Sequence, residues 1–541
     1  MDDLQELQSY VASANEAIEI NLVRPGKSPG SAEYIDEEPF HPNFTYEIFG
    51  QDEAIFGYKG LDIKLTFRAY DLRPALEVRF KDKFKPIGET EAMDVEGPLR
   101  KFLPESAFGK NQAFVEGELV ADESVSEWKP PGVQLTSYRH EGKKYEIWQS
   151  NLVDPKARSI FENGKILIPM NIEGGTCQEL EGEDMDWTLE RWKVFFLYEV
   201  TSSHRAPYVL TGFATSYRIW VFPTPQFLSQ INANSSTGPL YPTDVYPPPT
   251  APPHPSSEPP TFDAVKYSPL KAPSRERISQ FVILPPFQGR SHGSRLYNCL
   301  MRTFRADPYV VEVTVEDPNE NFDDLRDWCD IAYLRTDPDF AALSVPTELP
   351  PDALKPDGPA PADLILAPAT VDALRRKHRV APRQFARVAE MHLLSKIPRL
   401  HRSAARISRK EKSSHPMDRV FFFWRLLVKT RIYAQNADQM ADMEREERLE
   451  KVEAAMENVL GEYEEKLEGA ERRRTRMRDA GEDEEMAEAE PAAGQRRKRV
   501  VEDDEETDEE NGEGQGKQEG RLTVEDRGKR TKSEEKRVRT V

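Results

Sequence analysis

The chain of 541 residues contains very few cysteines. Only Cys177, Cys299 and Cys329 occur, widely spaced and without a CxxC pair. This number and spacing argue against a disulfide framework and against a zinc site. A reducing compartment therefore fits the composition. The acidic start, MDDLQELQSY, also lacks the apolar segment of a secretory signal.

The sequence also lacks a long apolar run and an excess of basic residues. The strongest apolar run, at residues 420–428, is interrupted by Arg425 and is shorter than the roughly 18 residues that a membrane span needs. With 95 acidic against 74 basic residues, the net charge is −21. This balance disfavours direct DNA binding, which needs basic surfaces to displace counterions. A basic partner or substrate is better matched electrostatically, although many acidic proteins have none.

Apolar patterning predicts a chain of mixed secondary structure. Alternating apolar residues predict strands within 57–70 and 75–84, and apolar, β-branched or aromatic runs predict more at 165–175, 192–201 and 208–223. We therefore expect an α+β fold. Its expected parts are an N-terminal mixed domain at 1–150, a central domain on a mixed sheet at 151–345, a helical C-terminal domain at 346–470 and a disordered charged tail at 471–541.

Two segments have compositions that oppose folding. Residues 224–273 contain thirteen prolines, which predicts a disordered insertion between two strands of the central domain. No aromatic residue follows Tyr463, where charged blocks dominate. Before the tail, apolar spacing of three to four predicts one long amphipathic helix from Met440 to Leu467. Packing of this helix on its own domain is favoured over a coiled coil with a partner.

The clearest functional signal is QFVILPPFQGRSHGSRLY at residues 280–297. An apolar strand ends in Pro285 and Pro286, and a polar loop from Gln288 to Gly293 opens directly into a helix. The N–H groups of such a loop and the helix dipole form an anion site suited to a pyrophosphate. Prolines remove backbone N–H donors from a β-ladder and promote a bulge, so the strand is expected to separate from its neighbour. Its unpaired peptide groups could then bind an extended amide ligand. A plain strand–turn–helix stays open as the alternative, because GxGxxG and P-loop patterns are absent.

The loop from Gln288 to Gly293 resembles motif A of the GNAT superfamily of N-acetyltransferases, R/Q-x-x-G-x-G/A. The wider string resembles the catalytic subunit of type B histone acetyltransferases of fungal type, where a QGxGHG loop follows a similar strand. Further segments resemble that family at residues 40–63, 172–176, 190–199 and 311–327. The resemblance implies a GNAT domain that transfers acetyl from acetyl-coenzyme A to a lysine amine without a metal.

The resemblance also implies where acetyl-coenzyme A binds. Main-chain groups of three strand residues would pair with pantetheine, and seven loop residues would hold the pyrophosphate: Phe281, Val282, Ile283, then Gln288, Gly289, Arg290, Ser291, His292, Gly293 and Ser294. Asn319 is a further candidate contact. Ser291 departs from the family, which has a glycine there. Either a positive φ strains this serine, or its hydroxyl bonds a phosphate.

Transfer to lysine requires a neutral amine, and the ordinary lysine pKa of about 10.4 calls for a general base near neutral pH. Glu316, at the end of a predicted strand, matches the glutamate of the family's EDP motif that takes this role. Glu173 and Asp317 match other family carboxylates near the amine. Because no base is recognisable beside Cys299, we expect direct transfer rather than an acetyl-cysteine step. His292 is expected to pack the loop.

The substrate and partner also follow from the resemblance. It implies action on the N-terminal tail of free, newly synthesised histone four before chromatin assembly, with a WD-repeat β-propeller histone chaperone as partner, in cytoplasm and nucleus. Residues that match the family's histone contacts are Gln51, Asp52, Glu53, Tyr217, Arg218 and Ile219. Two alternatives stay open. One is an acetyltransferase for other protein or small-molecule amines, and the other is a non-catalytic histone-binding scaffold.

Overall fold

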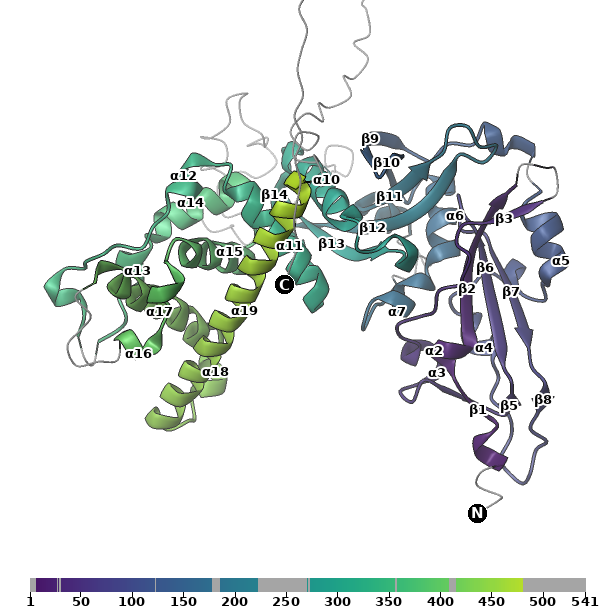
Figure 1. Cartoon of the computed structure of the whole chain (residues 1–541), viewed down its shortest axis with the longest axis horizontal. Helices are drawn as coiled ribbons and strands as arrows, with labels where there is room; N and C mark the ends of the chain where they lie inside the picture. Colours follow the sequence, from purple (N-terminus) through teal and green to yellow (C-terminus); the bar gives the residue numbers. More distant parts are fainter. Residues whose placement is uncertain are drawn as a thin grey trace, which may run out of the picture. The chain divides into compact units, whose positions relative to one another are not determined.

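The computed structural model describes residues 6–26, 28, 31–121, 123–177, 185–221, 270, 273–355, 358–407 and 415–479. Helices and strands combine in the predicted α+β fold (Figure 1). Almost all of the proline-rich segment 224–273 and the chain after residue 479 lie outside the described residues. Within the described part, no helix has both the length and the apolar composition that a bilayer crossing requires.

The N-terminal part contains a four-stranded sheet with strand order β3-β2-β6-β7, in which only β2 and β6 run parallel. Its strands are β2 Ile18–Pro25, β3 Ala32–Tyr34, β6 Asp62–Arg68 and β7 Pro74–Arg79. Two short ladders pair β1 Val11–Ser13 with β4 Ala54–Phe56 and β5 Tyr58–Lys59 with β8 Asp82–Lys83. The strands predicted within 57–70 and 75–84 are therefore confirmed.

Short helices and turns lie between these strands, between β8 and the central sheet, and between two strands of the central sheet. They are α2 Ala14–Ala17, α3 Tyr46–Phe49, α4 Glu96–Leu99, η1 Glu105–Ala107, α5 Gln112–Phe114, η2 Val115–Leu119, η3 Glu123–Ser126, α6 Pro155–Gly164, α7 Leu167–Asn171 and α8 Met185–Arg191. The strand predicted within 165–175 is wrong, because α7 occupies it. Its apolar residues are fully buried on a helix, and an apolar run this short looks alike in a helix and in a strand.

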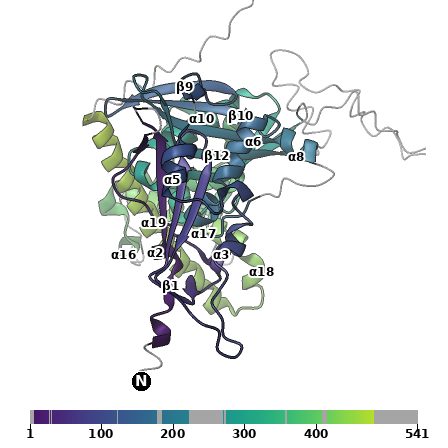
Figure 2. The same cartoon turned by 90° about the vertical axis from the view of Figure 1, so that its right-hand side faces the viewer.

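The central sheet has six strands in the order β14-β13-β12-β11-β10-β9. They are β9 Val133–His140, β10 Lys143–Asn151, β11 Trp192–Val200, β12 Tyr208–Trp220, β13 Ser274–Ile283 and β14 Val310–Val315. Neighbours are antiparallel except β13 and β14, which run parallel. Figure 2 shows α6 and α8 beside β10. The sheet draws on sequence from both sides of residue 150, and the expected domain boundaries stay predictions.

Two cores cover the two faces of this sheet. On β11, Val194 and Phe196 pack into a core shared with the N-terminal sheet, whereas Phe195 and Leu197 pack against α10 His292–Ala306. Successive side chains of a strand point to opposite faces. The unbroken apolar run of β11 therefore reflects burial on both faces, and it fixes helix α10 against one of them.

The C-terminal part is helical, as predicted. Its elements are α11 Glu320–Leu334, α12 Pro338–Ala342, η6 Pro351–Ala353, α13 Ala362–Ile365, α14 Pro368–His378, α15 Pro382–Ser395, η7 Arg399–His401, α16 Ala404–Ile407, α17 Pro416–Gln435, α18 Ala437–Met440 and α19 Arg445–Asp479. The predicted single helix from Met440 to Leu467 differs at both ends. It starts later, because α18 ends at Met440 and a turn precedes α19, and α19 continues to Asp479, so residues 471–479 are helical and not part of a disordered tail as expected. Met456, Leu460 and Tyr463 are buried against α15 and α17, so α19 packs on its own domain as favoured.

Candidate active site

The loop between β13 and α10 has a backbone that its own hydrogen bonds hold in place. Ser291 is the N-cap of α10 with φ 61° and ψ 8°, and its hydroxyl makes no capping bond. The Ser291 carbonyl accepts from the Ser294 hydroxyl at 3.0 Å and from the Arg295 N–H at 3.2 Å. Gln288 Nε2 donates to the Ile283 carbonyl at 2.8 Å. Ser291 therefore has the left-handed backbone that glycine adopts without strain.

His292 packs below this loop, as expected. The side chain is 1% exposed, and its Nδ1 lies 2.8 Å from the Tyr138 hydroxyl. The Tyr145 ring lies 4.4 Å from the imidazole, centroid to centroid. Burial lowers the pKa of His292 to about 3, so the ring is neutral near pH 7. It holds the start of α10 on the sheet and is not available as a proton carrier at that pH.

β13 and β14 separate at the end of the parallel ladder. Their pairing runs from Ser274 with Val310 to Ile278 with Val315, and β13 continues five residues further, to Ile283. On its other edge, β13 stays paired with β12, where the register shifts between Ala214 and Ser216. Residues 279–283 therefore present one peptide edge without a neighbouring strand among the described residues. This is the splayed strand that the sequence predicted.

Glu316 lies where the two strands diverge. Its N–H donates to the Ile278 carbonyl at 2.9 Å. The carboxylate accepts from the Tyr217 hydroxyl at 2.9 Å and from the Ser279 hydroxyl at 2.6 Å. Both donors are neutral hydroxyls, whereas the nearby Glu312 is paired with Arg275 and Arg375. Glu316 thus has a fixed orientation, and no salt bridge to a described residue neutralises it.

Tyr217 was expected to contact the histone, and in the structure its hydroxyl also contacts Glu316, the expected general base. Its ring stacks on Trp192 at a centroid distance of 4.7 Å, and Arg277 Nη1 donates to its hydroxyl at 3.5 Å. Burial raises the pKa of Tyr217 above its ordinary value, and Glu316 adds to this. The phenol therefore stays protonated and donates a hydrogen bond to the Glu316 carboxylate. Ser279 was missed in the sequence, since nothing local marks a serine as a partner of a distant carboxylate.

The other two candidate carboxylates lie on turns. Asp317 follows Glu316 and has φ 29°. Glu173 is exposed on the turn after α7. That turn is tied to β13, because Gln280 Nε2 donates to the Thr176 carbonyl at 3.0 Å. The Glu173 segment and the Glu316 segment are therefore both anchored on β13.

The remaining expected contacts differ in how their side chains are engaged. The Asn319 side chain caps α11 by accepting from the Phe322 N–H at 2.9 Å, and Phe281 packs on Phe322. Val282 is buried, Ile283 is half-buried, and Gly289, Arg290, Gln51 and Asp52 are exposed. The side chains of Arg290, Gln51 and Asp52 and the backbone at Gly289 are therefore accessible to a ligand without rearrangement.

Besides Tyr217, two further expected histone contacts have internal partners. Glu53 accepts from the Thr45 N–H at 2.6 Å and from Asn15 Nδ2 at 3.0 Å. Arg218 is 3% exposed and pairs with Glu276 and Asp307. Ile219 is half-buried. The Glu53 and Arg218 side chains are therefore engaged in contacts within the protein, and they hold the backbone beside the exposed Asp52 and beside Tyr217.

Cys299 is a core residue of α10. It is 3% exposed, and burial raises its thiol pKa to about 11. Such a thiol is almost entirely protonated near neutral pH, which opposes an acetyl-cysteine step. The geometry fits the direct transfer expected from the sequence.

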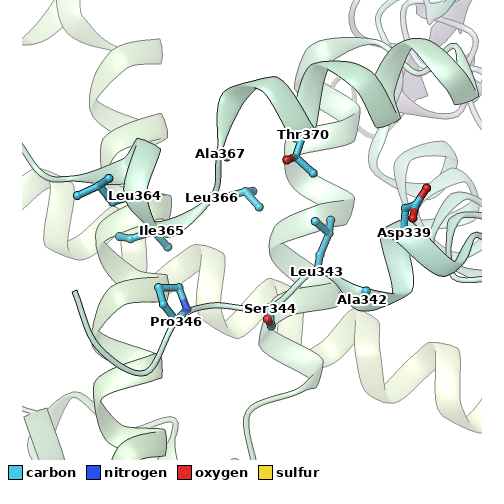
Figure 3. A pocket seen from close by; sticks show the side chains of 10 residues that line it. All are labelled: Asp339, Ala342, Leu343, Ser344, Pro346, Leu364, Ile365, Leu366, Ala367 and Thr370. Carbon is cyan, nitrogen blue, oxygen red and sulfur yellow. The ribbon is translucent and has the colours of Figure 1, made fainter. Parts of the chain in front are cut away.

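A hollow of about 440 Å³ lies away from these residues, among α12, α13 and α14 (Figure 3). Its lining includes Leu343, Pro346 and Leu366, and none of the candidate catalytic or cosubstrate-binding residues. This hollow therefore involves none of the residues that the sequence predicts for the site.

The sequence profile described as "Histone acetyl transferase HAT1 N-terminus" matches residues 10–173. Proteins described as histone acetyltransferase type B catalytic subunit align over much longer stretches. The Aspergillus oryzae protein is 36% identical over 468 residues, 84% of this chain and 85% of its own length. The chain belongs to this family. Similar subunits from Aspergillus fumigatus, at 35% identity, and Neurospora crassa, at 34%, align over 84% and 83% of this chain and over 76% and 86% of their own lengths.

Membership in the type B family makes this chain a histone acetyltransferase with acetyl-coenzyme A as its cosubstrate. The aligned lengths include the central sheet, because no stretch of such length fits within the N-terminal part alone. The resemblance of the chain to type B histone acetyltransferases is thereby confirmed.

Proposed function

We propose that this chain acetylates a lysine in the N-terminal tail of free, newly synthesised histone four before chromatin assembly, with Glu316 as general base. The observation that carries this proposal is the position of Glu316. It lies at the divergence of β13 and β14, held by Tyr217 and Ser279. Family membership supplies the reaction, and this geometry supports Glu316 as the base.

The chain's own groups suit the binding of acetyl-coenzyme A. The diverging edge of β13 offers peptide groups for the pantetheine arm. The first N–H groups of α10, at His292, Gly293 and Ser294, have no acceptor within the helix and face an anion site. A Cβ on Gly293 would lie 3.3 Å from Leu325 Cδ1, so glycine lets α10 start close to α11. The cosubstrate supplies an acetyl thioester at this position.

The residues around Glu316 fit direct transfer. Glu316 accepts one proton from the lysine ammonium, and the neutral amine then forms the N–C bond as the C–S bond breaks. The nitrogen loses a second proton as the amide forms, and the departing thiolate takes up one proton and leaves as coenzyme A thiol. Tyr217 and Ser279 hold the carboxylate in one orientation, which reduces the reorganisation that proton transfer would otherwise require.

The substrate and partner are the finer part of the proposal. The net charge of −21 favours a lysine-rich tail over DNA. Asp52, exposed beside Gln51, is an accessible acidic group for such a tail. Family resemblance supports a WD-repeat β-propeller histone chaperone as partner and activity in cytoplasm and nucleus.

The base assignment is tested by Glu316→Gln in the full chain. We expect kcat to fall roughly 100-fold or more, the usual range for loss of a general base, while acetyl-coenzyme A affinity stays the same. Glu320→Gln is the matched control, because Glu320 is an exposed glutamate four residues away. Activity of Glu316→Gln within a few-fold of wild type would refute the assignment, and Glu173→Gln and Asp317→Asn would then be tested.

Substrate class is tested by comparing peptides. A histone four tail peptide should be acetylated faster than tails of other histones and faster than small amines, and free histone faster than assembled chromatin. Equal rates for all amines would favour the broad-specificity alternative. Acetyl-coenzyme A binding without turnover would favour the histone-binding scaffold.

A further inference from the structure

Helix α19 reaches the start of α10, although about 180 residues of sequence separate them. Arg473 of α19 donates a hydrogen bond from Nη2 to the hydroxyl of Ser294. Ser294 is the third residue of α10, and its N–H is one of those that a helix leaves without an internal acceptor. The guanidinium therefore lies next to the proposed diphosphate position.

The packing of α19 on α11 places this arginine. Trp328 of α11 donates from its indole Nε1 to the Lys466 carbonyl at 3.2 Å. A Cβ on Gly469 would lie 3.2 Å from Trp328 Cζ2, so glycine permits the close approach despite its cost of about 1 kcal/mol within a helix. Arg473 then lies over the same indole, 5.7 Å from the ring centroid. Figure 1 shows α19 running beside α11 toward α10.

A second observation is the charge around this helix end. An α-helix N-terminus carries partial positive charge and favours acidic residues. The first turn of α10 has no acidic residue. Arg290 precedes it in the loop, Arg295 lies within it, and Arg473 reaches it from α19. Cations that gather at the positive end of a helix suit a site for a polyanion.

We propose that Arg473 completes the acetyl-coenzyme A site by binding the diphosphate of the cosubstrate. This inference rests on the proposed placement of the cosubstrate at the loop between β13 and α10. The C-terminal helix would then belong to the cosubstrate site as well as to the helical core. Occupancy of the site would in turn stabilise the last turns of α19, because binding and ordering are thermodynamically linked.

The test measures acetyl-coenzyme A binding to the full chain by calorimetry. Arg473→Met keeps an apolar stem over Trp328 and removes the charge, and Arg473→Lys retains a cation. Arg472→Ala is the matched control, since Arg472 is 63% exposed and lies 3.6 Å from Glu468. We expect Kd to rise roughly ten-fold for Arg473→Met, as for the loss of a hydrogen bond to a charged group. Arg473→Lys should recover part of the loss, and Arg472→Ala should bind like wild type.

Two further measurements separate the outcomes. With 3′-dephospho-acetyl-coenzyme A, Arg473→Met should show the same fold-loss, whereas a loss that disappears would overturn the diphosphate assignment. Wild-type affinity of Arg473→Met would overturn the inference altogether. Failure of the wild-type chain to bind acetyl-coenzyme A would instead refute the cosubstrate site itself.

Discussion

Replacing Ser291 with glycine is expected to stabilise the protein. The φ of 61° and ψ of 8° place this serine in the left-handed region, which costs a residue with a Cβ about 1–2 kcal/mol. Glycine removes that strain but loses about 0.5–1 kcal/mol through greater freedom in the unfolded chain. The net expected gain is about 0–1.5 kcal/mol in the free energy of unfolding. At roughly 2.1 cal/mol/K of unfolding entropy per residue, a chain of this size should show a rise in Tm of up to about 2 °C.

The same reasoning predicts a small effect on acetyl-coenzyme A binding. The Ser294 hydroxyl and the Arg295 N–H both donate to the Ser291 carbonyl and hold the backbone conformation. Because the fold itself imposes the strain, its relief contributes to folding in the free and the bound protein alike. Kd for acetyl-coenzyme A should therefore change by less than about two-fold, well under the 1.4 kcal/mol of a ten-fold change.

Ser291→Ala distinguishes strain from a phosphate contact. Alanine keeps the Cβ and the strain but removes the hydroxyl, which makes no capping bond. Thermal melts and calorimetry of wild type, Ser291→Gly and Ser291→Ala form the assay. A lower Tm for Ser291→Gly would refute the strain argument. A ten-fold weaker Kd for Ser291→Ala would show that the hydroxyl binds a phosphate.

Two further substitutions test Ser279, which lies beside the proposed base Glu316, and the buried imidazole of His292. Ser279→Ala removes one hydrogen-bond donor to Glu316 and should lower kcat about five-fold, the equivalent of one hydrogen bond of about 1 kcal/mol. Steady-state and binding assays should show an unchanged Kd for acetyl-coenzyme A. An unchanged kcat would contradict the positioning role of Ser279. The His292 pKa of about 3 lies below the ordinary value of 6.5, so the unfolded chain binds more protons and stability falls as pH drops from about 6.5 toward 3, by up to about 1.4 kcal/mol per pH unit. His292→Phe should flatten this slope in denaturant titrations between pH 6.5 and 5, and identical slopes for both proteins would disprove it.

Local patterns predicted much of the fold. The strands β6, β7, β11, β12 and β13 and the helical C-terminal part were predicted, because apolar periodicity and turn residues are properties of short segments. Segment 165–175 was the exception. Its apolar residues fit a strand or a helix equally well. In the structure they form α7, which is buried in the core shared with the N-terminal sheet.

The sequence by itself determined the family, the strand–loop–helix of the proposed cosubstrate site and the candidate base Glu316, because each depends on contiguous residues. Only the tertiary structure decided which side chains meet there. Tyr217 and Ser279 reach Glu316 from β12 and β13, and Arg473 reaches Ser294 from α19. Such contacts depend on strand register and helix packing over long sequence separations, which local periodicity does not specify. The left-handed backbone of Ser291 was decided in the same way, because surrounding packing and hydrogen bonds hold a conformation that serine alone disfavours.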